Sequence, residues 1–269
     1  MALMAVLALP YSLWIAVALL SAATLTGAWI ARRNSERVGV WLAIASTLMS
    51  VSALSGILPD AWRSAAALGV FPWAVPLTAA AGFLVVGLFT RGAYRAVAGG
   101  GERGRGGLHS PGRHRRVERM LGAAVFAGMG AAVPLTLHRA VDGTAPSLIA
   151  TAPVPVALGL VTLALMVHCA SEGLALAALL GISRQRLAPW LVLACASPVL
   201  GVALAVVHPL PADVAPVVLA AVAGGLLRVA FVCLRLASGR RRAGELSRGQ
   251  LVSATVAASA VGTLLGLAY

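Results

Sequence analysis

The feature that most constrains this chain is a series of long apolar segments separated by short clusters of arginine. Hydrophobic residues make up 60% of the chain and charged residues only 11%, whereas a soluble domain is usually about 25% charged. Only a lipid environment accommodates so much apolar side chain, and helices satisfy their own backbone hydrogen bonds there. The sequence therefore predicts an all-α integral membrane protein.

A membrane-spanning helix needs about 20 apolar residues, and the chain holds eight segments of this kind. They cover roughly residues 4–31, 38–58, 67–90, 119–146, 149–181, 188–207, 213–236 and 249–269. We therefore expect a polytopic bundle of eight transmembrane helices, with residues 1–269 forming a single transmembrane domain.

The arginines indicate how such a bundle is oriented. Eighteen of the 21 cations lie in alternate loops, within residues 32–37, 91–119, 184–186 and 235–248. The positive-inside rule places these loops in the cytoplasm and both termini outside. Arginine without lysine, in a chain rich in Ala, Gly, Val and Leu, is typical of a GC-rich bacterial genome, so we expect the bacterial inner membrane. Arg228 instead lies within the seventh span, where it either pairs with a carboxylate or extends towards the cytoplasmic edge.

The longest predicted cytoplasmic loop, residues 91–118, is rich in glycine and arginine and contains His109 and His114. A segment of this composition cannot bury a core, so we expect it to be a disordered linker. Collection of metal ions or binding of anionic lipid is the alternative role for this loop. The net charge of +13 does not indicate nucleic-acid binding, because no soluble domain is apparent to carry a basic face.

Six of the eight acids lie in predicted loops or at span ends, and the other two each follow a histidine by four residues. These pairs are His138 with Asp142 and His168 with Glu172. A charge at the centre of a membrane helix costs about 2.5–3.5 kcal/mol on insertion scales, so each acid needs a partner.

Residues four apart lie on one face of a helix, so each pair presents an imidazole and a carboxylate together. Two neighbouring helices that face each other would surround one point with His138, Asp142, His168 and Glu172. This ligand set suits Zn²⁺, and also Fe²⁺ or Mn²⁺. The simpler alternative is that each histidine only neutralises its own buried acid.

A glycine follows each acid directly, at Gly143 and Gly173. A glycine at these positions allows either the close approach of a second helix or a local break beside the site.

The two motifs, "HRAVDG" and "HCASEGLALA", resemble those in the fourth and fifth spans of the ZIP (Zrt-, Irt-like protein) divalent-metal transporters. "GILPDAW" and "CASPVLGVAL" resemble segments of that family's second and sixth spans. The resemblance implies an inverted-repeat bundle in which one helix group moves against another. It also implies that His138, Asp142, His168 and Glu172 are metal ligands. Cys169 and Met49 are further candidate soft ligands under this resemblance, which additionally implies a homodimer.

The chain departs from the family pattern at the second metal position. Arg139 stands where the family usually has asparagine, and Ser197 stands where the sixth span has an acid. A guanidinium cannot bind a metal ion and stays protonated. Arg139 either compensates the charge of the two acids in place of a second cation or faces away from the site.

We therefore expect a single-site, ZIP-like transporter that moves a divalent cation, with zinc preferred, into the cytoplasm. Its partners would be the metal ion and membrane lipid. One alternative is a non-transporting relative that acts as a sensor or scaffold, with Arg139 filling the second position. The other is a membrane metalloenzyme, which we do not expect, because the chain has no His-Glu-x-x-His motif and no spare acid near the site to serve as a base.

Overall fold

The computed structural model describes residues 11–98, 155–182, 186–207 and 211–266, and no strand occurs among them. This finding confirms the all-α prediction. The helices are α2 (Tyr11–Arg33), η1 (Ser35–Arg37), α3 (Val38–Val51), η2 (Ser52–Ile57), α4 (Leu58–Ala67), α5 (Ala74–Ala98), α8 (Pro155–Ile182), α9 (Leu187–Val207), α10 (Ala215–Arg242) and α11 (Arg248–Gly266). The predicted fourth span, residues 119–146, lies outside the described residues.

Three helical stretches in the described part of the chain are long and apolar enough to cross a membrane. They are Trp14–Arg33, Ser35–Ala67 and Ala215–Arg242. Shorter apolar stretches occur at Ala74–Leu88, Met166–Gly181 and Leu187–Ala203. These lengths agree with a membrane protein, while the number of eight spans stays a prediction.

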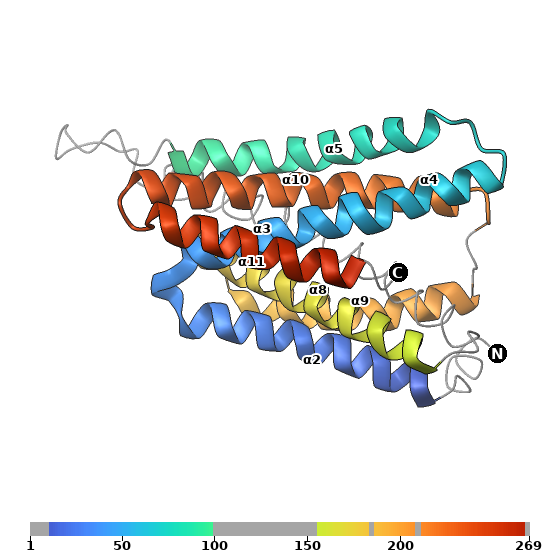
Figure 1. Ribbon diagram of the computed structural model, residues 1–269, viewed down its shortest axis with the longest axis horizontal. Helices are drawn as coiled ribbons and strands as arrows, with labels where there is room; N and C mark the ends of the chain where they lie inside the picture. The colour runs from blue at the N-terminus through green and yellow to red at the C-terminus, as the bar shows by residue number, and fades with distance from the viewer. Residues whose placement is uncertain (1–10, 99–154, 183–185, 208–210, 267–269) are drawn as a thin grey trace, which may run out of the picture.

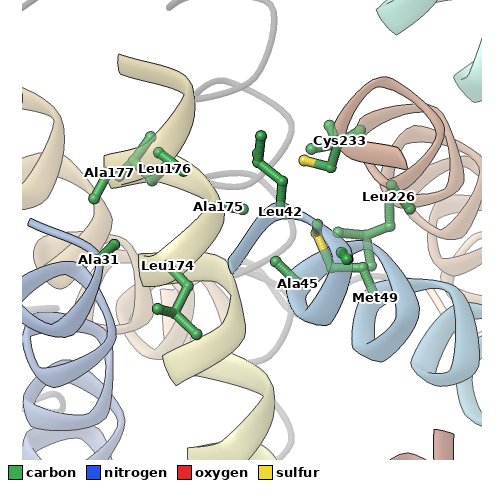
Figure 2. Close-up of a cluster of buried hydrophobic side chains, with 14 of the residues drawn as sticks. Ala31, Leu42, Ala45, Met49, Leu174, Ala175, Leu176, Ala177, Leu226 and Cys233 are labelled. Carbon is green, nitrogen blue, oxygen red and sulfur yellow. The ribbon is translucent and has the colours of Figure 1, made fainter. Parts of the chain in front are cut away.

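The helices pack in two groups (Figure 1). In one group α2 packs against α8 and α9. In the other, α10 packs against α5, α3 and α4, and α11 packs against α3. The groups meet where α3 and α11 contact α8. The main apolar core lies at this junction, with Leu42 and Met49 from α3, Ala175 from α8 and Leu226 from α10 (Figure 2).

Helix direction alternates along the chain, so the arginines collect at one end of the bundle. In Figure 1, α2, α5, α8 and α10 run in one direction and α3, α9 and α11 run in the other. The last turn of α2 contains Arg32 and Arg33, and the last turn of α10 contains Arg240, Arg241 and Arg242. The described helices therefore agree with the predicted placement of arginine clusters on alternate connections.

Two helix pairs, α2 with α8 and α5 with α10, are in backbone contact through reciprocal glycines. A Cβ atom added at Gly27 would overlap the carbonyl oxygen of Ala170, and one at Gly173 would overlap that of Thr24. A Cβ atom added at Gly82 would likewise overlap the carbonyl oxygen of Ala221, and one at Gly224 would overlap that of Ala79. Small residues allow such close approach, and the dense packing that results holds membrane helices together.

Gly173 therefore serves close helix approach, which was one of the two roles predicted for it. The other role, a local break, is wrong at this position because α8 continues unbroken to Ile182.

A π-helical segment, η2, interrupts the otherwise continuous helix that runs from α3 into α4. Pro59 lies two residues after it, and proline removes one backbone donor and clashes with the carbonyl four residues earlier. The wider turn of a π-helix accommodates that carbonyl, and such turns are frequent at functional sites. The predicted span ends at about residue 58, whereas the helix continues to Ala67.

Helix α5 is displaced towards the C-terminus relative to the predicted span. It begins at Ala74 rather than residue 67 and ends at Ala98 rather than residue 90. Helix α5 therefore includes residues 91–98 of the predicted loop, where alanine and arginine favour the helix. The rest of that loop, with His109 and His114, lies outside the described residues.

Replacing Gly173 with alanine should lower the free energy of unfolding by about 1–3 kcal/mol, the usual cost of overpacking, because the Thr24 carbonyl occupies the space of the added methyl group. Thermal unfolding of the detergent-solubilised protein measures this change. Gly181→Ala is the matched control in the same helix, since no heavy atom lies within 4 Å of the added Cβ atom. Equal behaviour of the two variants would contradict the close packing of α2 on α8.

Candidate metal centre

Helix α8 brings the predicted His168 and Glu172 together in the protein interior. Their side chains are 8% and 1% exposed, and His168 Nε2 lies 3.4 Å from Glu172 Oε1. Alanine and leucine dominate the turns on either side of this pair, and both residues favour a helix. The i, i+4 spacing therefore produces the predicted arrangement of imidazole and carboxylate.

A third polar group at this site is Ser52, which the sequence analysis missed. Its hydroxyl lies 3.0 Å from His168 Nδ1, although the two residues are 116 positions apart in the chain. Ser52 is the first residue of η2, so the π-helical segment begins at the contact. Pro59 was the one local sequence feature that indicated an irregular turn here, and it did not reveal which helix would pack against that turn.

The Ser52 hydroxyl can serve either tautomer of the imidazole, because it both donates and accepts hydrogen bonds. When the Nδ1–H group donates to Ser52, the lone pair of Nε2 is directed to the side of Glu172. That tautomer is the one that binds a metal ion through Nε2, and such outer hydrogen bonds orient metal-binding histidines. The other tautomer accepts from Ser52 at Nδ1 and directs an N–H group at the carboxylate.

The separation of Nε2 from Oε1 is compatible with a shared cation. A charge-assisted hydrogen bond is usually about 2.7–2.9 Å long, and the observed 3.4 Å exceeds this. Two ligands on a tetrahedral zinc ion, with bonds of about 2.0–2.1 Å, lie about 3.3–3.4 Å apart. The pair thus has the spacing of two zinc ligands.

Cys169 and Met49, the other predicted ligands in the described residues, lie in different surroundings. Cys169 is buried in a cluster with Leu20 and Ala23 of α2. Met49 is fully buried in the core beside Leu226 of α10 (Figure 2). Neither residue is in the contact that joins His168 to Ser52.

Ser171 and Ser197 are buried serines, and Ser197 stands at the position where the resemblance to the ZIP family implies an acid. The Ser171 hydroxyl donates to the carbonyl of His168, and the Ser197 hydroxyl donates to the carbonyl of Ala194. Both hydroxyls therefore bond within their own helices. Ser197 supplies no charged oxygen where the family has an acid.

The predicted partner motif, with His138, Arg139 and Asp142, lies in the segment 99–154, outside the described residues. Within the described ranges, no group of three or more His, Cys, Asp and Glu residues is close enough to hold a metal ion. The structure thus brings together one histidine–acid pair and leaves the four-ligand site a prediction.

Comparison with protein-family models and with curated proteins finds no match to this chain.

Replacing Ser52 with alanine should lower the free energy of unfolding by about 0.5–1.5 kcal/mol, the net value of one hydrogen bond. Ser55→Ala is the matched control, because the Ser55 hydroxyl lies in the same π-helical segment but donates to Val51 of its own helix and is exposed. Thermal unfolding in detergent measures both variants. If Ser55→Ala lowers the free energy of unfolding as much as Ser52→Ala does, the hydrogen bond to His168 does not contribute to stability.

Proposed function

We propose that this protein is a transporter of divalent metal cations, with zinc as the preferred substrate. The observation that supports the proposal is the buried pair of His168 and Glu172, whose facing atoms have the separation of two zinc ligands. His138 and Asp142, which repeat the same spacing in the preceding predicted span, would complete a four-ligand site.

The position of the pair suits transport. Glu172 is 1% exposed, so a cation bound there must exchange its water for protein ligands. The pair lies on α8, and Ser52 belongs to the other helix group, so the site is at the junction of the two groups. Movement of one group against the other would expose the site to either side in turn.

The arginines support a proposed orientation in the membrane, and we propose inward transport on that basis. Their clusters lie on alternate connections, and the described helix ends that carry them gather at one end of the bundle. The positive-inside rule assigns that end to the cytoplasm and both termini to the outside of a bacterial inner membrane. A cation that enters at the opposite end is delivered inward.

The proposed site holds a single cation. Arg139, next to His138 in the sequence, would stand in place of a second metal ion beside the two carboxylates. The Ser197 hydroxyl donates to the carbonyl of Ala194 within α9. This supports a single-cation site, because Ser197 provides no carboxylate for a second metal ion.

A non-transporting sensor or scaffold is the second candidate, and the same serine favours it. A chain that has lost the acid at Ser197 has a reduced ligand set, and a tethered guanidinium at Arg139 could block the path as well as compensate charge. This candidate keeps metal binding but predicts no flux.

Zinc uptake into proteoliposomes tests the proposal. The wild-type protein should accumulate zinc, and His168→Ala should reduce uptake to background because the site loses a ligand. Ser55→Ala, away from the His168 contact, should transport like the wild type. No uptake by the wild type, together with uptake by Arg139→Asn, would contradict the proposal and establish that the arginine blocks the path.

Ser52→Ala should retain transport at high zinc concentration but with a KM raised about 10–100-fold, the usual effect of removing an outer hydrogen bond from a metal-binding histidine. The dependence of the uptake rate on zinc concentration measures this. An unchanged KM would mean that Ser52 does not orient His168 for binding.

A further inference from the structure

Helix α10 carries three arginines at seven-residue intervals, Arg228, Arg235 and Arg242. Seven residues are nearly two turns, so the three side chains lie on one face of the helix, with about 10 Å between successive members. We call these three residues the arginine track. It begins near the middle of α10 and ends at the last residue, in the arginine-rich end of the bundle.

Aromatic rings hold the inner two members of the track. The Arg228 guanidinium lies 5.3 Å from the ring centroid of Phe83 on α5 and 5.5 Å from that of Phe231. Arg235 lies 4.7 Å from the Phe231 centroid. Phe231 therefore contacts two guanidinium groups, and the contacts continue from Phe83 through Arg228 and Phe231 to Arg235. Such cation–π contacts stabilise a guanidinium where water is scarce.

The absence of a side chain at Gly87 makes room for the innermost arginine. A Cβ atom there would lie 3.4 Å from Arg228 Nε and 3.6 Å from Cζ. The side chain of Arg228 thus lies against the backbone of α5 as well as against the ring of Phe83. Arg228 of α10 is therefore in contact with α5.

The outer two members of the track are exposed and carry unbalanced charge. Arg235 and Arg242 are exposed, and among the described residues neither forms an ion pair with a carboxylate. Exposed arginines such as Arg32 and Arg241 likewise form no ion pair among the described residues, whereas Arg63 pairs with Asp60 and Arg240 pairs with Glu245. This face of α10 is therefore complementary to an anion.

The surface beside the track is apolar. Phe231 and Leu234 of α10 are 38% and 43% exposed, and Leu84 and Leu88 of α5 are 59% and 67% exposed. Inorganic phosphate would not contact these apolar side chains favourably, whereas a fatty-acyl chain would pack against them. The two kinds of surface lie side by side, as the headgroup and the tail of a lipid do.

We propose that the face formed by α5 and α10 binds an anionic phospholipid from the leaflet at the arginine-rich end. Arg235 and Arg242 contact the phosphate, since a guanidinium binds phosphate with two parallel hydrogen bonds. The acyl chains lie along Phe231, Leu234 and the exposed leucines of α5. Arg228, one step deeper, is held by its two rings and draws the headgroup inward, and local thinning of the bilayer accommodates such a deep charge.

This lipid site is independent of the proposed metal site. The arginine track lies on α10 and the exposed leucines beside it lie on α5, whereas His168 and Glu172 lie on α8. Loss of metal transport therefore does not test the lipid site, and loss of lipid binding does not test transport.

Native mass spectrometry of the full chain in detergent, titrated with phosphatidylglycerol or phosphatidylcholine, tests the proposal. The wild type should bind the first phosphatidylglycerol in strong preference to phosphatidylcholine. In Arg235→Gln/Arg242→Gln this preference should fall by about fivefold for each arginine removed, hence about twenty-five-fold for both. Phe231→Leu, which keeps the apolar bulk but removes the ring that holds Arg235, should weaken the preference by about threefold.

Helix α2 provides the matched control. Its last turn contains two exposed arginines, Arg32 and Arg33, and Arg33 lies 5.2 Å from the ring centroid of Trp29. Arg32→Gln/Arg33→Gln therefore removes the same charge and a similar cation–π contact at the same end of the bundle, and it should bind phosphatidylglycerol like the wild type. An equal loss in both double variants, or no preference in the wild type, would overturn the proposal, as would equal competition by inorganic phosphate.

Discussion

The structure around α8 depends on the burial of one carboxylate, that of Glu172. An ionised group in an apolar surrounding needs partners close by, and α8 supplies His168 one turn earlier at 3.4 Å. Ser52 extends the polar contact from α8 to the second helix group. Gly173, the next residue, brings the backbone of α2 against this turn, so protein rather than water covers the pair. The chemistry of the site and the packing of the helices therefore have a common cause.

The bundle contains a second charge near the middle of an apolar helix, and it is stabilised differently. Arg228 lies beside the adjacent rings of Phe83 and Phe231, and the residue Phe231 is 38% exposed. Glu172 instead is enclosed on all sides at 1% exposure. An enclosed carboxylate beside an imidazole is suited to bind a cation that has lost its water. A guanidinium held by rings at the outer surface is suited to an anion that arrives from the lipid.

The sequence predicted those features that depend on one helix alone. Arginine clusters located the ends of α2 and α10 to within six residues, and the spacing of His168 and Glu172 predicted their contact. Ser52 could not be predicted, because its role depends on which helix packs against η2 and apolar periodicity does not specify the partner. Cys169 illustrates the same limit, because adjacent residues lie about 100° apart around a helix. Cys169 consequently faces α2 while its neighbour His168 reaches Ser52.

The contacts within the helix groups differ in kind from the contact between them. Within a group, reciprocal glycines place α2 on α8 and α5 on α10 in backbone contact, and separation of such surfaces loses close packing along the whole crossing. Between the groups, the polar contact at the site is the hydrogen bond between Ser52 and His168, worth about 0.5–1.5 kcal/mol net, in addition to the apolar core at the junction. Relative movement of the groups would therefore break this hydrogen bond and repack the apolar core at the junction, while the glycine crossings within each group stay intact. A cation at Nε2 requires the tautomer that donates to Ser52, so binding of the ion and the junction of the groups are linked through one imidazole ring.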